Sequence, residues 1–166
     1  MYDIEWDSVG TLRGDYIRSF FLFPNFWVEP GTEISHKLQW KRYKFTERNA
    51  QKIDTSKGVY CFVLQPKVNN FFETKYLFYV GKTQRTLRIR YKEYLDELSG
   101  KRKSRTKIKD ILDKYYDRLF FYYAVIDDKT IIDEVEDNLI DKFIPWANVR
   151  IRRAQINPKF QYLYGH

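Results

Sequence analysis

One carboxylate stands out among the four acidic side chains between Asp133 and Asp137, in a segment whose pattern predicts a helix at 130–143. Apolar residues mark one face of that helix, at offsets of 3, 7 and 11 from the first: Ile132, Val135, Leu139 and Phe143. Glu136 falls inside this stripe, whereas the other acids lie at its margins or, like Glu134, point away. A carboxylate that faces inward needs a cation, which is a metal ion, a buried arginine or its own proton.

An arginine holds a comparable position in an earlier predicted helix, at 85–98. The apolar stripe there consists of Leu87, Tyr91, Tyr94, Leu95 and Leu98. Arg90 lies three residues after the first of these and four before Tyr94, so it falls on the same stripe. Arg88 falls to the side. Because burying a bare guanidinium is prohibitive, Arg90 must be paired or must line a cleft. A structural ion pair is the alternative to a functional role.

Two tyrosines belong to a predicted hairpin with a glycine at each outer end. Gly58–Leu64 is a continuous apolar run, which is typical of a strand covered on both faces. Tyr76–Gly81 resumes the β-favouring pattern after a polar loop. The two end glycines mark places where the backbone bends or approaches another group closely. Tyr60 and Tyr79 lie beside them.

These two triplets resemble the signature of the GIY-YIG endonucleases. Gly58-Val59-Tyr60 stands where that family has GIY, and Tyr79-Val80-Gly81 stands where it has YIG, with a longer loop between them than is usual. Further residues match positions of the family motif, in chain order Lys82, Arg90, Tyr94, Glu136 and Asn148. Each motif alone is weak, but the set is specific, and it is most similar to the excision-repair branch. The resemblance covers residues 57–150.

The resemblance implies metal-dependent hydrolysis of a phosphodiester bond in nucleic acid. Glu136 would hold one divalent ion, Mg²⁺ or alternatively Mn²⁺, because a lone carboxylate completed by waters and substrate oxygens suits such an ion. Arg90 would neutralise charge on the transition state. Tyr60 would act as general base, with Lys82 and the metal supplying the positive charge that a phenol of pKa about 10 needs at neutral pH.

The remaining matched residues have supporting roles in the same interpretation. Tyr79 and Tyr94 would orient water or phosphate. Asn148 would position the substrate or a neighbouring site residue. The resemblance also implies a central three-stranded antiparallel sheet flanked by helices, with the two triplet tyrosines, the arginine and the glutamate meeting at one cleft.

The predicted elements form an α+β domain, with strands at 58–65, 76–81 and 119–126 and helices at 85–98, 106–117 and 130–143. We divide the chain into a mainly β or irregular N-terminal extension at 1–52, a GIY-YIG-like domain at 53–150 and a basic tail at 151–166. Within the extension, Lys37–Phe45 interleaves basic and aromatic residues, a pattern that can neutralise phosphates and stack bases. We favour a half-buried edge strand with lysines on its solvent side.

The charge balance favours a polyanionic partner. Thirty Lys and Arg residues against 22 Asp and Glu give a formal net charge of +8, which indicates nucleic acid, DNA in the first place with RNA left open, ahead of an anionic membrane surface. The candidates for phosphate contact are Lys101, Arg102, Lys103, Arg105, Lys107, Arg150, Arg152 and Arg153. Such contacts release counterions, so binding should weaken steeply with salt.

Composition disfavours several other classes. The single cysteine, Cys61, and the two histidines, His36 and His166, exclude a disulfide framework and a zinc site built on Cys or His. They fit a reducing, cytoplasmic compartment. No apolar run approaches membrane-spanning length, so we expect no membrane partner.

Two rival functions remain beside the nuclease. One is the same fold used only to bind nucleic acid or another protein. The other is a basic DNA- or RNA-binding domain in which an Arg90–Glu136 pair is structural. Metal-dependent cleavage distinguishes the nuclease from both. A homodimer is expected if the protein cuts both strands, and restriction, repair, homing, phage attack and phage defence all stay open as biological roles.

Overall fold

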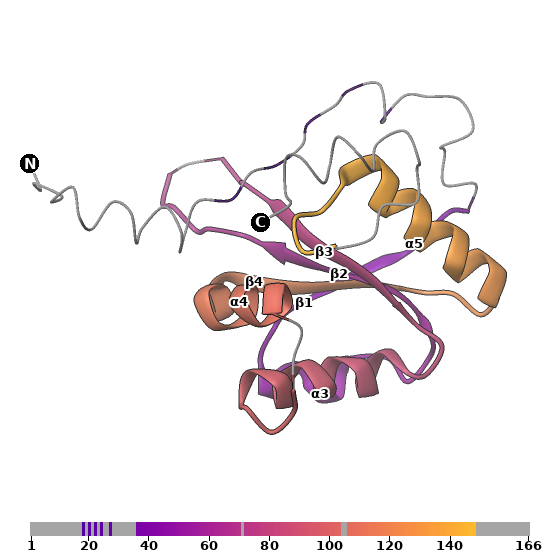
Figure 1. Ribbon diagram of the computed structural model, residues 1–166, viewed down its shortest axis with the longest axis horizontal. Coiled ribbons are helices and arrows are strands. Elements are labelled where there is room, and N and C mark those ends of the chain that lie inside the picture. Colours follow the sequence, from indigo (N-terminus) through magenta and orange to yellow (C-terminus); the bar gives the residue numbers. More distant parts are fainter. Residues whose placement is uncertain are drawn as a thin grey trace, which may run out of the picture.

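A four-stranded antiparallel sheet forms the centre of the molecule (Figure 1). The computed structural model describes residues 36–70, 72–103 and 106–148, together with residues 18, 20, 22, 24 and 27. The strand order is β1-β4-β2-β3. The strands are β1 (Trp40–Lys44), β2 (Gly58–Leu64), β3 (Tyr76–Thr83) and β4 (Leu119–Val125).

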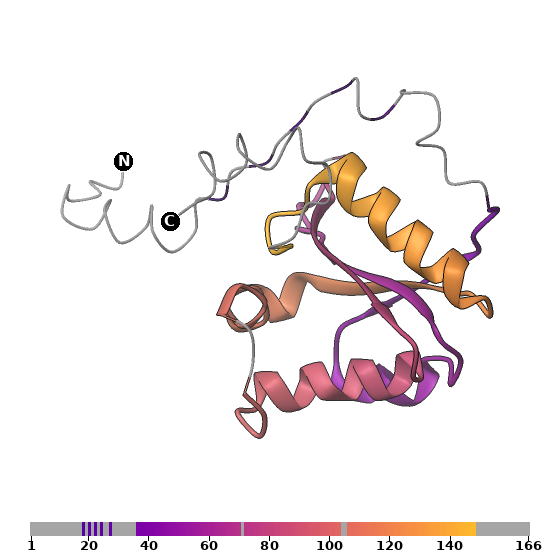
Figure 2. The same ribbon diagram turned by 45° about the vertical axis from the view of Figure 1, so that its right-hand side comes forward.

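Helices cover the sheet on both faces. They are α3 (Leu87–Leu98), α4 (Thr106–Tyr115) and α5 (Lys129–Phe143), with the short 3-10 turns η1 (Glu47–Lys52) and η2 (Tyr116–Arg118). α3 and α4 lie on one face and α5 on the other, as both ribbon views show (Figure 1, Figure 2). The expected α+β class, with an antiparallel sheet flanked by helices, is confirmed. Across the described ranges, no helix is both long and apolar enough to cross a bilayer.

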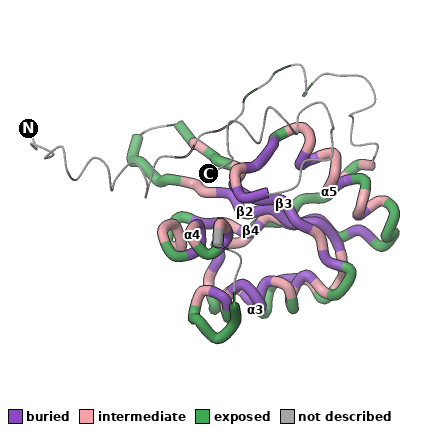
Figure 3. The backbone as a smooth tube through the Cα atoms, viewed as in Figure 1, coloured by how far each residue is buried: buried purple, intermediate pink, exposed green. Residues whose placement is uncertain are grey.

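β2 is the central strand that carries the buried apolar run. It pairs with β3 on one side and β4 on the other, with Tyr60 opposite Gly81 and opposite Tyr123. Six of its seven residues are buried, because both faces of the strand are covered. Figure 3 shows buried positions concentrated in the sheet and on the helix surfaces turned toward it.

Alternation along the strands divides the core into two halves, one on each face of the sheet. Tyr60 and Phe62 belong to the half that packs against α3 and α4. Val59 and Cys61 belong to the half that packs against α5. Successive residues of a strand point to opposite faces, so the face on which a side chain lies decides which helix it can meet.

The fourth strand was not expected, and it comes from the segment that the sequence analysis assigned to the N-terminal extension. β1 pairs with β4 and stands at the edge of the sheet. The expected number of strands was therefore one too few, whereas the interpretation of Lys37–Phe45 as an edge strand is confirmed for Trp40–Lys44. Within β1, Tyr43 packs against the α3 half of the core. Arg42 lies on the other face, where it donates a hydrogen bond to the Tyr122 hydroxyl.

Local capping explains where the helices begin and end. The side chain of Thr86 accepts the backbone N–H of Ile89 and starts α3. Gly100 follows the same helix with φ 76°, a left-handed conformation that glycine adopts readily. The Asp128 carboxylate accepts the backbone N–H groups of the next turn and starts α5.

The inward face of α5 differs from the predicted stripe at its C-terminal end. Val135 and Leu139 are buried as expected, but Phe143 is 43% exposed and Ile140 is buried instead. The reason is that α5 ends at Phe143, and the chain turns away at Ile144 in a left-handed conformation.

Candidate active site

Arg90 is the centre of a hydrogen-bonded group on the α3 face of the sheet. Its guanidinium donates from Nε to Tyr60 Oη at 2.9 Å and from Nη2 to Tyr94 Oη at 3.0 Å. The two hydroxyl oxygens are themselves 2.9 Å apart and share a hydrogen bond. The arginine side chain is 19% exposed, so the group joins two buried phenols to a cation that solvent reaches.

Three elements bring these groups together. Arg90 and Tyr94 lie one turn apart on the same side of α3, and Tyr60 comes from the central strand. Gly81 on β3 leaves the space that the phenol needs, because a Cβ there would lie 2.6 Å from Tyr60 Oη and 2.8 Å from the Tyr79 ring. The glycine of the second triplet therefore makes room for the tyrosine of the first.

The first triplet also needs its glycine. A Cβ at Gly58 would lie 2.1 Å from the carbonyl oxygen of Ala124, so β2 and β4 can approach closely only with glycine at this position. Tyr79 is buried on the same face as Tyr60, with the two ring centroids 6.2 Å apart. The two glycines thus allow close packing around β2, against β4 at Gly58 and against the Tyr60 and Tyr79 rings at Gly81.

The Tyr60 hydroxyl is held as a neutral phenol in this arrangement. Burial raises the pKa of Tyr60 well above its ordinary value, and the neighbouring Tyr79 raises it further, whereas the Arg90 guanidinium opposes the rise. The cation beside Tyr60 is Arg90. Lys82, which was expected to supply positive charge there, contacts residues of α5 instead.

Glu93 is a buried acid that the sequence analysis missed. Its carboxylate lies 2.8 Å from Arg90 Nη1, 2.7 Å from Arg85 Nη2 and 2.8 Å from Arg102 Nη1. Burial alone would raise the pKa of Glu93, but hydrogen bonds from the three arginines lower it to about 2. The carboxylate therefore stays ionised and holds Arg90. Its spacing of three residues from Arg90 on one helix is the signal that could have revealed it.

Arg88 has a different environment from Arg90, as the stripe geometry predicted. It donates from Nε to the backbone carbonyl of Ile53 at 2.8 Å and from Nη2 to that of Gln51 at 3.0 Å. These contacts tie α3 to η1 and its C-terminal end. Arg88 is thus part of the scaffold, and Arg90 is the arginine that meets the tyrosines.

A second group of matched residues lies on the α5 face. Lys82 Nζ lies 2.7 Å from a Glu136 carboxylate oxygen and 2.9 Å from one of Asp133. Partial burial lowers the pKa of Lys82, but the hydrogen bonds to Glu136 and Asp133 outweigh this effect and raise the pKa overall. The lysine therefore stays charged. Glu136 is 15% exposed, which makes it an inward but accessible carboxylate, as its place on the stripe predicted.

The two groups are joined through adjacent residues of β3. Gly81 faces the Tyr60 hydroxyl, and Lys82, the next residue, faces α5, because neighbours on a strand point to opposite sides. The structure therefore brings Tyr60, Arg90 and Tyr94 into direct contact and brings Glu136 to Lys82. The single cleft implied by the resemblance takes the form of two groups on either face of this edge strand.

Asn148 holds the edge of β3 between the two groups. Its amide oxygen accepts the Val80 N–H at 2.9 Å, and its amide nitrogen donates to the Val80 carbonyl at 2.8 Å. The preceding residue, Ala147, donates its backbone N–H to the Phe78 carbonyl at 2.9 Å. The buried Asn148 side chain thus takes the place of a neighbouring strand and fixes the backbone next to Tyr79 and Gly81.

A comparison with protein families bears directly on this set of residues. The sequence model of the GIY-YIG catalytic domain matches residues 57–148, which is more than half of the chain. The chain belongs to the GIY-YIG family. This family consists of nucleases that act on nucleic acid. Searches of curated proteins and of solved structures found no match to the chain.

Glu136 and Asp133 are the carboxylates of this GIY-YIG domain that could hold a metal ion. Within the residues that the structure describes, no three or more His, Cys, Asp or Glu side chains are grouped to hold a metal. Glu136 and Asp133 nevertheless lie close enough together to share one ammonium group. Two carboxylates in an accessible position offer the hard oxygen donors that Mg²⁺ prefers, with waters and phosphate oxygens to complete its shell.

The basic residues predicted to contact phosphates are only partly described. Lys101, Arg102 and Lys103 lie exposed in the loop after α3, and Lys107 lies in α4 with its ammonium 5.3 Å from the Trp146 ring centroid. Arg102 reaches back to Glu93 and so connects this loop with Arg90. The other candidates lie outside the described residues: Arg105, Arg150, Arg152 and Arg153.

Proposed function

We propose that the protein is a metal-dependent endonuclease that hydrolyses phosphodiester bonds, with DNA as its first expected substrate. The observation that carries this proposal is the contact of the Arg90 guanidinium with both the Tyr60 and the Tyr94 hydroxyls, within a domain of a nuclease family. A permanent cation that is hydrogen-bonded to two phenols and partly reached by solvent suits a site where a charged phosphate must be bound and attacked.

Arg90 is the residue that we propose to neutralise the phosphoryl group. A guanidinium carries five N–H donors, and the contacts with Tyr60, Tyr94 and Glu93 use three of them. Two donors remain for the oxygens of a phosphate. Because Glu93 and the tyrosines hold the guanidinium from three nitrogens, it would not need to reorganise as negative charge develops.

Tyr60 is the proposed general base, which would take a proton from the attacking water at Oη. Burial raises its pKa, so the phenol needs the Arg90 guanidinium beside it to favour the phenolate. Tyr94 Oη, within hydrogen-bonding distance of Tyr60 Oη, can stabilise the same negative charge. Tyr79 and the Asn148 clamp on Val80 would hold this end of β3 in place.

Glu136, with Asp133 as a second oxygen donor, would hold the divalent ion, Mg²⁺ in the first place and Mn²⁺ as the alternative. When bound, the ion would polarise a phosphoryl oxygen and stabilise the leaving 3′-oxygen. Lys82 would then have to leave the two carboxylates, and its charge becomes available to the substrate phosphate. We expect the loop around Lys101 and Lys103 to bind flanking phosphates, in a cytoplasmic protein that would need two copies to cut both strands.

The alternative is a domain that binds nucleic acid without cutting it. The ion pairs of Lys82 with Glu136 and Asp133 favour this reading, because they neutralise both carboxylates without a metal. Cleavage is the property that separates the two functions.

Arg90→Ala tests the proposal, with Lys92→Ala as the matched control because Lys92 is exposed on the same helix. We expect Arg90→Ala to lower the rate of plasmid cleavage by about 10²- to 10³-fold, as loss of a donor to a transition-state charge does. Binding of the same DNA in EDTA should change only a few-fold, and the control should cut normally. Unchanged cleavage by the Arg90 variant would remove the basis of the proposed site.

A further inference from the structure

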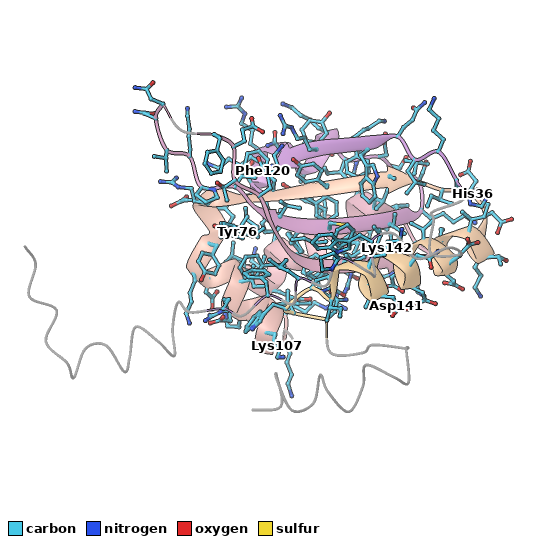
Figure 4. All side chains as sticks on the ribbon, turned by 90° about the horizontal axis from the view of Figure 1, so that it is seen from above. His36, Tyr76, Lys107, Phe120, Asp141 and Lys142 are labelled. Atoms are coloured by element: carbon cyan, nitrogen blue, oxygen red, sulfur yellow. The ribbon has the colours of Figure 1, made fainter. Side chains whose placement is uncertain are left out.

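An aromatic groove lies on the α5 face of the sheet, in the part that the helix leaves open. α5 packs against β3 and β2. Seen from the α5 side, β4 and β1 lie beside the helix rather than beneath it, with Phe120 and Tyr76 at one end of the sheet (Figure 4). A groove of about 760 Å³ occupies this region. Six aromatic side chains line it: Phe20, Trp27, Trp40, Tyr76, Tyr122 and Phe143.

Several of these rings keep a large part of their surface in contact with solvent. Trp40 and Tyr76 are each 40% exposed, and Phe143 was predicted to be buried but is not. Scattered exposed apolar residues are ordinary, but several large rings around one groove indicate a binding surface. Trp40 belongs to the segment of β1 whose alternation of basic and aromatic residues the proposed nuclease mechanism does not use.

Basic residues border the aromatic groove. A second hollow of about 390 Å³ shares Lys75 with the groove and is lined by three cations and one acid, Arg42, Lys67, Lys75 and Glu73. Arg42 lies on the same face of β1 as Trp40, two residues away, and donates a hydrogen bond to the Tyr122 hydroxyl. The surface therefore combines stacking rings with an excess of positive charge.

The groove is on the same face of the sheet as Glu136. It reaches Cys61, which pairs with Val80 of β3, two residues before Lys82. Along α5, Phe143 follows Glu136 by seven residues, which corresponds to about 10 Å of helix. A strand with one phosphate near Glu136 could therefore place its next bases over the groove.

We propose that this groove binds unpaired bases of a nucleic acid strand, with the strand's phosphates on the side of Arg42. The inference rests on the proposed function for its choice of nucleic acid as partner. Every base presents a flat face that can stack on a tryptophan or tyrosine ring, while cations beside the rings follow the backbone. Paired bases are already stacked inside a duplex. The groove is therefore expected to bind single strands, and duplexes that carry a flap or a bulge, more tightly than a fully paired duplex.

Trp40→Ala and Tyr76→Ala test the groove by binding alone. Fluorescence anisotropy is measured in EDTA with a labelled single strand and with the blunt duplex of the same sequence. We expect each variant to bind the single strand about ten-fold more weakly, the typical loss of one stacked base, and to bind the duplex almost unchanged. Trp40→Phe keeps a ring and should retain most of the affinity. Ile89→Ala is the control, since Ile89 is exposed on α3, on the opposite side of the sheet.

Several outcomes would overturn the inference. One is an equal loss of affinity for the single strand and for the duplex, and another is unchanged binding by both ring variants. A third is loss of a dimer in Trp40→Ala without loss of single-strand affinity, which would assign the groove to a second copy of the chain. Circular dichroism verifies that each variant is folded. If the wild-type protein never cuts but its single-strand binding depends on Trp40, the nuclease proposal fails and the groove stands. If it cuts and the ring variants bind normally, the groove fails and the nuclease stands.

Discussion

The chemistry proposed for this GIY-YIG domain depends on the charge state of single side chains. Tyr60 is buried, its pKa is raised, and Arg90 is the cation that touches it. Glu93 is less deeply buried, and hydrogen bonds from three arginines lower its pKa to about 2. The phenolate fraction of Tyr60 therefore grows as the pH rises, whereas Glu93 is an anion across the physiological range.

We predict that cleavage rises with pH through the neutral range. The fraction of phenolate at Tyr60 grows about ten-fold per pH unit below its raised pKa, so log kcat/KM should climb with a slope near one. The measurement is a pH–rate profile from pH 6.5 to 9 (roughly the range below a tyrosine pKa) at saturating Mg²⁺. Tyr60→Phe should be slower by about 10²- to 10⁴-fold and should lose the slope. A flat profile in the wild-type protein would contradict the role of Tyr60 as base.

We predict that Glu93→Gln loosens Arg90 and lowers kcat by about ten- to a hundred-fold, as small misplacements of a catalytic group do. Its stability effect has a defined pH dependence. Because the folded pKa lies below the ordinary value of 4.5, the carboxylate stabilises the protein above pH 4.5, and this contribution disappears as the pH falls toward about 2. Urea unfolding at several pH values should show that the difference in the free energy of unfolding between wild type and variant narrows as the pH falls from 4.5 toward about 2. A gap that widens toward acid pH would be the contrary result.

The matched side chains could be predicted from the sequence because each has a local signal. Arg90 and Glu136 break apolar stripes on helices, and Tyr60 belongs to a triplet that resembles a family motif. Glu93 has a weaker local signal, its spacing of three residues from Arg90, because its other two partners, Arg85 and Arg102, lie outside α3 and reach it only in the folded chain. The contacts of Lys82 with α5 were not predicted either. Strand alternation turns its side chain away from Tyr60, and that follows only once β3 is known to extend to Thr83.

Among the elements, the edge strand β3 has the largest influence on the site. It carries Tyr79 and Gly81 toward α3 and Lys82 toward α5. An edge strand lacks one neighbour in its sheet, and here the side chain of Asn148 supplies hydrogen bonds to the free edge at Val80. The two halves of the site therefore depend on one side chain from the segment after α5.

We predict that Asn148→Ala destabilises the protein by about 2 kcal/mol, because it leaves a buried N–H and carbonyl without their partners. Hydrogen exchange at the Val80 amide should accelerate, and cleavage should fall through disorder of β3. Asn138→Ala in α5 is the matched control, since it removes the same chemical group from a half-buried helix position. Unchanged exchange at Val80 would show that the clamp contributes nothing to the strand.

The elements themselves were predictable to within a few residues. Strong apolar runs gave β2 and β4, and periodic stripes gave α3 and α5. β1 was expected as an edge strand but not as a member of this sheet, because pairing between Trp40 and Ala124 joins segments far apart in the sequence and leaves no local pattern. Phe143 was misplaced for a related reason. The end of the helix at residue 143 was predicted, but the stripe does not show that the chain then turns in a left-handed conformation at Ile144.

Among the described residues, basic side chains are exposed on the α3 side of the sheet and also on the α5 side. The loop after α3 presents Lys101 and Lys103, and the open sheet face presents Arg42. With a formal net charge of +8, the protein should approach nucleic acid quickly and lose affinity as salt rises.

We predict that Lys101→Ala with Lys103→Ala weakens binding to every sequence alike and lowers the slope of log K against log salt by about two for duplex DNA, one for each lost phosphate contact. Titrations at several salt concentrations in EDTA give this slope. Lys52→Ala is a suitable control. Lys52 belongs to η1, away from the loop after α3, and its ammonium lies over the ring of Tyr43 in β1. An unchanged slope would mean that Lys101 and Lys103 do not contact the DNA phosphates.

The most direct measurement is cleavage of plasmid and single-stranded DNA by the wild-type protein, Glu136→Ala and Glu134→Ala, with Mg²⁺, with Mn²⁺ and with EDTA. Glu134 is the matched control, because it is an exposed acid on the same helix. We predict cutting by the wild type and the control in either metal, none in EDTA, and none by Glu136→Ala although it still binds DNA. Binding without cutting under every metal, or cutting that survives both EDTA and the loss of Glu136, would contradict a metal-dependent nuclease at this site.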